Sequence, residues 1–589
     1  MASAWHFTRQ RVSLGLVNLS LLGGLMGSCD QLPKPPPAAE VVPAESAPEA
    51  EAPSTDTLRL LYGRLPTTLN PHLANGFQDF EAARIVYEPL ASYDAAGNLM
   101  PILAATAPTP DNGGVAADGR SVTWQLRQGV VWSDGTPFTA ADVVFTFEFA
   151  SNPVVAAATA DYYEAIETVE ALDDHTVKVT FNQPTPAWDL PFVGQNGLIL
   201  PAHLFAEVNN EQARAATANL RPVGTGPYRF VAADKGRWLF VPNDRYRDAA
   251  PDFERLELQG GVVPYGAALQ VLQSGTADFA HNLQLAADQL ATLTDTDTGR
   301  LVTRFGPQVE RIMFNFADPD TETETGERAS PEIPHPFLSD RTVRRAIDLA
   351  IDRAAIAAQY GNFGRPTRQL LVAPSQYVSE QITYTYDPAQ AQALLAEAGW
   401  QDTNGNGIRD QNGVEMQLRF RTSVNPVRQE TQALVKQFLA EVGIEVINER
   451  IRIDDFFSPD PAQSDSLNHF YADLQEYATG NATPDPTVYL SWWTCGEIAQ
   501  QANQWQKPNN ARYCNPTYDS LWQAANNELD PAQRAVLFRR MDELLAEDVA
   551  LMPLVHRATT HGISQRLTGY ELTPWDASTW DIANWRRRD

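Results

Sequence analysis

The chain has 589 residues, of which 43% are apolar and 10% aromatic, so it can bury one large hydrophobic core or several smaller ones. Its net charge of −29 disfavours non-specific binding to nucleic acid or to an anionic membrane surface. The three cysteines form neither a CxxC pair nor a Cys/His cluster of the kind that binds zinc.

Residues 1–28 have the pattern of an export signal. Arg9 and Arg11 form a basic start, and the apolar run 12–26 is shorter than the ~20 residues that span a bilayer. The run ends in MGSC at 26–29, which is similar to the lipobox of bacterial lipoproteins, where cleavage occurs before the cysteine. We therefore predict export, with Cys29 lipidated and anchored to the cell membrane, facing the periplasm or the cell exterior. An ordinary signal peptide is the alternative.

Residues 29–57 are predicted to be a disordered tether. The stretch 30–57 contains seven prolines, six acidic residues and one lysine, a composition that cannot bury a core. At ~3.1 Å per residue, an extended polyproline-like chain of this length would reach roughly 85 Å. The folded body is therefore expected to begin at residue 58.

The stretch 121–150 is the most informative part of the body. Alternating apolar residues predict a strand near its start and a second short one at 130–132. Thr139 is typical of a helix N-cap, and Asp142 stands three residues later, as in a capping box. A helix is expected from there to residue 150.

The second half of the chain contains two well-marked helical patterns. Thr342–Gln359 has apolar residues at helical spacing and Asp340 as a cap, which predicts one long helix. Asp387 and Pro388 supply the N-cap and first residue of another helix. Because strands alternate with helices throughout the body, the sequence predicts a mixed α/β (α+β) fold.

Four strings in this order resemble the signatures of one family: LRQGVVWSDGTPFTAADVVFTFE at 126–148, VGTGPY at 223–228, QVLQSGTADF at 270–279 and LSDRTVRRAIDLAIDR at 338–353. The family is the bacterial extracellular solute-binding proteins of family 5, the peptide/nickel-type receptors of ABC importers. VGTGPY is not a phosphate loop, because it lacks the GK[ST] ending. The resemblance spans nearly the whole body.

The resemblance implies a two-lobed periplasmic-binding-protein-like fold of type II. The first lobe would comprise 58–304, with an extra subdomain at about 101–221. The second lobe would comprise 305–550, and residues 551–589 would return to the first. The ligand would be enclosed between the lobes when they close about a hinge.

The implied function is capture of a peptide or peptide-like solute and its delivery to a membrane permease. The partners would be the permease and its ATPase, with no nucleic acid, and the receptor would be a monomer. A receptor for a non-peptide solute, such as a sugar or metal chelate, and a ligand sensor without transport are the alternatives. No GxSxG, HExxH, Walker A or GxGxxG motif is present, so we expect no enzymatic activity.

The stretch 473–493 is the expected ligand contact, because it is rich in aromatic and small polar residues broken by glycine and proline. The resemblance implies an aspartate here that binds a peptide's α-ammonium, yet the matching residues are Asn481 and Ala482. We therefore expect peptides with a free amine to bind weakly. A surface loop without a ligand role is the alternative. The candidate ligand-binding residues are Asn75, Phe77, Tyr477, Thr479, Asn481, Asp485 and Trp493.

Two further sites are predicted. Cys495 and Cys514 would form a disulfide in an exported chain, with two buried free thiols as the alternative. The stretch 402–410, DTNGNGIRD, resembles a calcium loop, although Gly413 stands where the bidentate glutamate belongs and Glu415 comes two residues late. The ligands of a structural Ca²⁺ would be Asp402, Asn404, Asn406 and Asp410. A hairpin without metal is the alternative, and no other cofactor is expected.

Overall fold

The computed structural model describes residues 56–293 and 296–588, so the predicted signal, Cys29 and most of the tether lie outside the described residues. Its main feature is an 11-stranded mixed sheet in which β12 (Gly364–Pro366) pairs with β18. The mixed α/β class is confirmed. The strand order is β16 (Glu445–Ile451), β15 (Gln417–Ser423), β17 (Leu474–Thr479), β11 (Gly299–Phe314), β18 (Leu551–Ser564), β10 (Phe279–Ala280), β1 (Thr57–Leu61), β9 (Arg255–Gln259), β8 (Arg237–Pro242) and β7 (Tyr228–Asp234).

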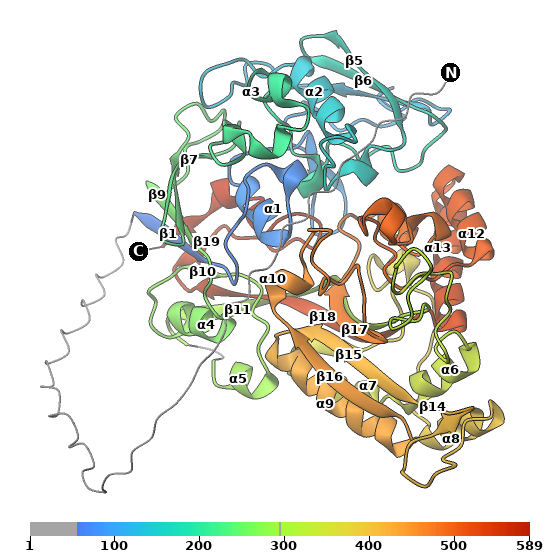
Figure 1. The fold of residues 1–589 in the computed structure, drawn as a ribbon. Coiled ribbons are helices and arrows are strands. Elements are labelled where there is room, and N and C mark those ends of the chain that lie inside the picture. Colours follow the sequence, from blue (N-terminus) through green and yellow to red (C-terminus); the bar gives the residue numbers. More distant parts are fainter. Residues whose placement is uncertain (1–55, 294–295, 589) are drawn as a thin grey trace, which may run out of the picture. The chain divides into compact units, whose positions relative to one another are not determined.

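The two long strands β11 and β18 join the halves of this sheet (Figure 1). Residues 299–305 of β11 pair with 558–564 of β18, next to β10. Residues 309–314 of β11 pair with β17 on one side, and residues 309–313 pair with β18 on the other. The register of the β11–β18 pair shifts between Phe305 and Val309, so the ladder is interrupted where one half of the sheet meets the other.

The hydrophobic cores divide in the same way. One large cluster runs from Leu58 to Leu258 and includes Phe279, Ile563 and Trp585, and a smaller one surrounds α4. Two other clusters contain only residues between Ile312 and Val555. We call the elements around the first pair of clusters the first lobe and those around the second pair the second lobe.

The remaining elements cover the sheet and extend the first lobe. The helices are α1 (Phe77–Ala83), α2 (Ala140–Ala150), α3 (Ala202–Phe205), α4 (Pro264–Leu272), α5 (Ala287–Ala291), α6 (Arg341–Ala350), α7 (Arg353–Ala358), α8 (Pro388–Glu397), α9 (Pro426–Glu441), α10 (Ile453–Phe456), α11 (Thr487–Ser491), α12 (Pro516–Asn527) and α13 (Pro531–Asp548). The strands outside the main sheet are β2 (Ala91–Tyr93), β3 (Leu99–Pro101), β4 (Ser121–Gln125), β5 (Ile166–Asp173), β6 (Thr176–Phe181), β13 (Asp410–Gln411), β14 (Val414–Glu415), β19 (Leu567–Thr568) and β20 (Arg586–Arg587). None of the helices in the described ranges is long and apolar enough to cross a membrane.

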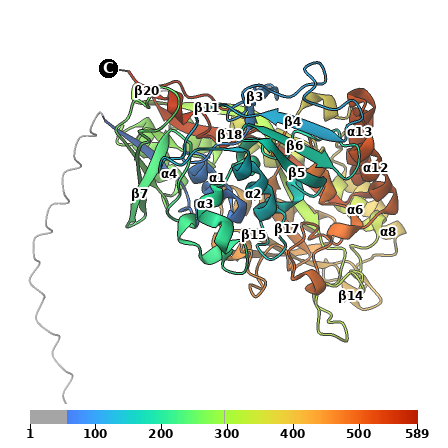
Figure 2. The same ribbon diagram turned by 90° about the horizontal axis from the view of Figure 1, so that it is seen from above.

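The informative stretch 121–150 forms part of a separate small sheet. Its first strand is β4, which belongs to the order β4-β6-β5, with α2 packed against β5 and β6 (Figure 2). The predicted cap is present, since the Asp142 carboxylate accepts the Thr139 backbone N–H at 2.9 Å and the Trp132 indole N–H at 3.3 Å. The second predicted strand forms only an isolated bridge between Val131 and Pro137.

The single helix predicted over 342–359 is wrong. The chain forms α6 and then α7, and Ile351 between them has extended backbone angles. The first helix ends at Ala350, and Asp352 caps the second, because its carboxylate accepts the N–H groups of Ala354 and Ala355. Arg353 then donates to the carboxylate of Asp348, so a buried ion pair stabilises the break.

The VGTGPY string has a steric explanation. Gly226 donates its N–H to the carbonyl of Val86 at 2.8 Å, and Gly224 accepts the N–H of Ser133 at 2.9 Å. A Cβ on Gly224 would lie 2.0 Å from the Val86 carbonyl oxygen, and one on Gly226 would lie 2.6 Å from it. The two glycines therefore permit a backbone approach that no other residue allows.

Replacing Gly224 by alanine is expected to destabilise the first lobe by about 1–3 kcal/mol or more, because the backbone of Val86 must move. Gly496→Ala is the matched control, since a Cβ there meets nothing within 4 Å. Thermal unfolding of both variants measures the difference. Equal unfolding temperatures would show that the backbone of Val86 can move away from the new methyl group without a loss of stability.

Candidate functional site

The predicted ligand stretch lies on β17 and on the loop that follows it. In the β11–β17 pair, Arg311 stands directly opposite Tyr477, so their side chains share one face of the sheet. The Arg311 guanidinium carbon lies 4.6 Å from the centre of the Tyr477 ring and 5.8 Å from that of Trp493. Arg311 also donates to the Thr479 hydroxyl. The structure thus gathers three predicted residues around one arginine.

Asn481 has a mainly structural position. Its side-chain N–H₂ donates to the carbonyls of Ala373 at 3.1 Å and Thr483 at 2.9 Å. Its side-chain oxygen is buried without a hydrogen-bond partner. Because Ala373 packs against the first-lobe core, Asn481 helps to hold the second lobe against the first.

Asp485 already has a cationic partner. Arg534 on α13 donates both of its terminal nitrogens to this carboxylate, one of them at 3.2 Å. The neighbouring Pro484 lies against Gly97 in the turn between β2 and β3, where a glycine Cβ would meet it at 3.2 Å. The loop after β17 is therefore part of the contact between the two lobes.

A second carboxylate faces Asp485 from the first lobe. Asp189 accepts the Tyr93 hydroxyl at 3.2 Å. Burial and then the negative charge of Asp485 raise the pKa of Asp189 to about 6. The Arg534 charge opposes this shift. The lobe contact thus contains an acid that gains a proton close to neutral pH.

The two candidates in the first lobe lie apart from this group. Asn75 donates its backbone N–H to Asp79 and its side chain to Thr67, and Phe77 is 52% exposed. Among residues 56–293 and 296–588, no hydrogen bond, ion pair or ring contact joins either of them to the β17 loop. Their role as ligand contacts stays a prediction.

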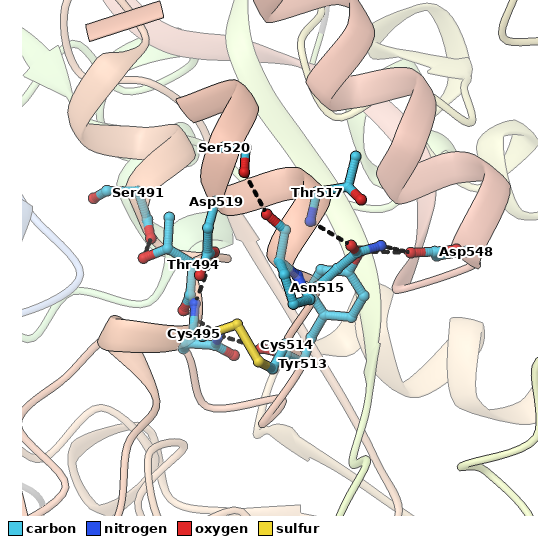
Figure 3. Close-up of a disulfide and its surroundings, with 12 residues drawn as sticks. Ser491, Thr494, Cys495, Tyr513, Cys514, Asn515, Thr517, Asp519, Ser520 and Asp548 are labelled. Atoms are coloured by element: carbon cyan, nitrogen blue, oxygen red, sulfur yellow. Dashed lines mark hydrogen bonds between the residues drawn. A yellow bond between two sulfur atoms is a disulfide. The ribbon is translucent and has the colours of Figure 1, made fainter. Parts of the chain in front are cut away.

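The predicted cysteine pair is bonded in the structure, with Cys495 joined to Cys514 (Figure 3). Asp519 on α12 accepts the Cys495 N–H at 3.1 Å, and Asn515 caps the same helix through the Thr517 N–H. The disulfide therefore fastens the segment just after Trp493 to the start of α12.

The side chains of the calcium-like loop bond to the loop itself. The Asp402 carboxylate accepts the N–H groups of Gly405, Asn406 and Gly407 at 2.7–3.1 Å. Glu415, two residues beyond the expected ligand position, accepts the side-chain N–H₂ groups of Asn404 and Asn406 at 3.1 and 2.7 Å. Within the described ranges, no group of three or more His, Cys, Asp or Glu could hold a metal ion. Calcium at this loop stays a prediction.

Sequence reasoning missed Arg311, Arg534 and Asp189. Arg311 is a charged residue directly before the apolar run Ile312–Phe314 at the end of β11, and that contrast could have indicated it. Arg534 and Asp189 carry no such local signal, because each meets the loop only through the tertiary fold.

Comparison with solved structures defines the fold as that of the type II periplasmic binding proteins. NikZ of Campylobacter jejuni, solved in complex with Ni(L-His), matches with a TM-score of 0.77 and 22% identity over 91% of this chain and 100% of that one. The oligopeptide-binding protein AppA of Bacillus subtilis, solved with a nonapeptide, matches with a TM-score of 0.74 and 22% identity over 90% and 99%. The predicted two-lobed fold class is confirmed.

The family model "Bacterial extracellular solute-binding proteins, family 5 Middle" matches residues 98–501, and the chain belongs to this family. The glutathione-binding protein GsiB of Pectobacterium atrosepticum is 26% identical over 516 residues, which cover 86% of this chain and 89% of that protein. A Brucella ovis protein named for peptide binding in an ABC transporter is 27% identical over 483 residues, covering 80% and 81%. The family consists of exported binding proteins, not enzymes.

Proposed function

We propose that this protein is the receptor of an ABC importer and that it captures a peptide or peptide-like solute between its two lobes. The observation that carries the proposal is the loop after β17, which contacts the first lobe and directly follows the aromatic and polar residues of that strand around Arg311. Such a group on rigid strands is typical of a solute site. The names of the relatives, which include peptide and glutathione binding, support the same solute class.

The interruption of the β11–β18 ladder supports motion between the lobes. Among the described residues, the main sheet has two strands that cross between the lobes, β11 and β18, and their register is broken at residues 306–308 of β11. Few backbone hydrogen bonds resist bending there, so the crossing can serve as the hinge. The solute would enter while the lobes are apart and would be enclosed on closure.

The test is to find a solute that co-purifies or binds. Native mass spectrometry of the full-length chain in mild detergent would detect a bound small molecule. Calorimetry with di- and tripeptides and glutathione would then give affinities. Binding of a sugar or a metal chelate, with no response to any peptide, would favour the non-peptide alternative. Solute binding without any effect of the protein on solute uptake by cells would favour a sensor.

The lobe contact should make solute affinity depend on pH. Where the lobes touch, the pKa of Asp189 is about 6. Separating the lobes would remove Asp485 and readmit water, so we expect this pKa to fall toward the ordinary 3.8 in the open protein. Because the acid's pKa is raised on closure, closure is favoured at low pH and this contribution is lost as the pH rises through about 6. Affinity at pH 5 should therefore exceed that at pH 7 by roughly tenfold. Asp189→Asn should flatten this profile; an unchanged profile in the variant would place the titrating group elsewhere.

A further inference from the structure

Arg311 is a buried cation that forms no ion pair in the described parts of the chain. Its side chain is fully buried, at 0% exposure. It donates from Nη1 to Thr479 and from Nε to the Met313 sulfur at 3.4 Å, while Nη2 has no hydrogen-bond partner. In the described parts of the chain, no carboxylate oxygen lies within 4.0 Å of its guanidinium group. Burying a charge without an opposite charge or a full set of hydrogen bonds costs free energy, so a bound group that supplies both would stabilise Arg311.

The acids of neighbouring positions already have partners or lie on the other face of the sheet. Glu310 precedes Arg311 but bonds to Arg428 through both of its oxygens. Glu476 precedes Tyr477 on β17, so its side chain points to the opposite face of the sheet; burial and then the charge of Glu310 raise its pKa. Asp485 in the following loop is paired with Arg534. None of these carboxylates forms an ion pair with Arg311, although its charge adds to the downward shift in the pKa of Glu310.

A second unsatisfied donor lies beside the first. The indole N–H of Trp493 is buried without a partner, and the ring of Trp493 lies 5.8 Å from the Arg311 guanidinium carbon. Two neighbouring donors, one of them charged, match an acceptor with two oxygens and a negative charge. A carboxylate has this chemistry.

We propose that Arg311 and Trp493 bind the carboxylate of the solute, so that the site selects anionic solutes and does not require a free amine. The inference rests on the proposed function, because it assigns the solute class of the same site. It agrees with the uncharged Asn481, whose free side-chain oxygen can accept a neutral N–H but cannot balance an ammonium group. The preferred solute is a peptide-like molecule whose carboxylate reaches β11.

Two matched peptide series test the solute class. In one, tripeptides carry an acetylated amine and a free carboxylate; in the other, the same sequences carry a free amine and a carboxamide. Calorimetry on the full-length chain should show the acids binding at least tenfold more tightly than the amides, as expected for a charge-assisted contact. Arg311→Met should lower the affinity for the acids to that for the amides and leave the amides unchanged.

Arg365→Met is the matched control. Arg365 also stacks on an aromatic ring of β11, with its guanidinium carbon 3.8 Å from the centre of the Phe305 ring, but it is exposed and lies outside this group. The control should keep the preference for acids. Acids and amides that bind equally well would overturn the assignment of Arg311 and leave the proposed function intact. No binding of either series would count against the peptide function itself.

A second measurement needs no solute. If Arg311 serves binding, its unpaired charge weakens the empty protein, and Arg311→Met should unfold at or above the wild-type temperature. If Arg311 only stabilised the fold, Arg311→Met would unfold at a lower temperature than the wild type. A lower unfolding temperature for Arg311→Met, with Arg365→Met unchanged, would overturn the proposal.

Discussion

Replacing Arg428 by methionine is expected to lower the free energy of unfolding by about 3–5 kcal/mol, the usual effect of removing one partner of a buried ion pair. Arg428 lies on α9 and donates to the Glu310 carboxylate on β11 from Nε at 3.1 Å and from Nη2 at 3.2 Å. Both side chains are almost completely buried. The variant would leave a carboxylate in the second lobe without its main partner.

The local electrostatics explain why the effect should be large. Burial raises the pKa of Glu310, but the charges of Arg428 and then Arg557 outweigh it, so the net shift is downward and the group is ionised. Burial and then the Glu310 charge raise the pKa of its neighbour Glu476. Without Arg428, Arg557, whose Nε lies 3.4 Å from the carboxylate, would remain as an ion-pair partner of Glu310, with a weaker contribution from the Arg311 charge.

Arg540→Met is the control for this measurement. Arg540 pairs with Glu547 at 2.7 Å on the exposed side of α13, so its loss should change stability by about 1 kcal/mol at most. Urea unfolding followed by tryptophan fluorescence compares the two variants. Similar midpoints for Arg428→Met and Arg540→Met would mean that the second lobe relaxes around Glu310 or admits water to it.

Replacing Cys29 by serine is expected to move nearly all of the protein from the membrane fraction to the soluble fraction. The MGSC motif at 26–29 motivates this prediction, because serine has no thiol to accept the lipid. Each buried CH₂ of an acyl chain contributes ~0.8 kcal/mol, so a lipidated cysteine holds a protein at the membrane and an unmodified residue does not. Cell fractionation with immunoblotting measures the distribution.

Ser28→Ala serves as its control, since it keeps a small residue before the cysteine. This variant should stay with the membrane. The unfolding temperature of the soluble Cys29→Ser protein should equal that of the wild type, because the change lies outside the folded body. Unchanged membrane association of Cys29→Ser would contradict the predicted anchor and require another one.

Features set by neighbours in the sequence were predictable. The cap formed by Thr139 and Asp142 is present, and so is the helix that begins after Asp387, whose carboxylate accepts the Gln390 N–H at 2.9 Å. Helical spacing over 342–359 gave the correct element but not its interruption. The break is stabilised by ion pairs of Asp348 with Arg353 and with Arg368. The spacing of apolar residues contains no information about ion pairs.

The site was predictable only in part, for the same reason. The aromatic and glycine-proline character of the β17 loop indicated a binding stretch, and Tyr477, Thr479 and Trp493 do lie together. The sequence did not reveal that Arg534, 49 residues away, already balances Asp485. Nor did it indicate Arg311, because the pairing of β11 with β17 joins segments more than 160 residues apart.

The position of β18 in the main sheet also bears on the order in which the protein folds. β10 and β11 flank β18, and the first-lobe core contains Ile563, Trp575 and Trp585. During synthesis the second lobe is therefore nearly complete while the first still lacks a central strand. Contacts between such distant segments form slowly, so the nascent first lobe keeps open sheet edges until late in translation. A chain that stays incompletely folded for so long is suited to crossing a membrane as an extended polypeptide before it folds.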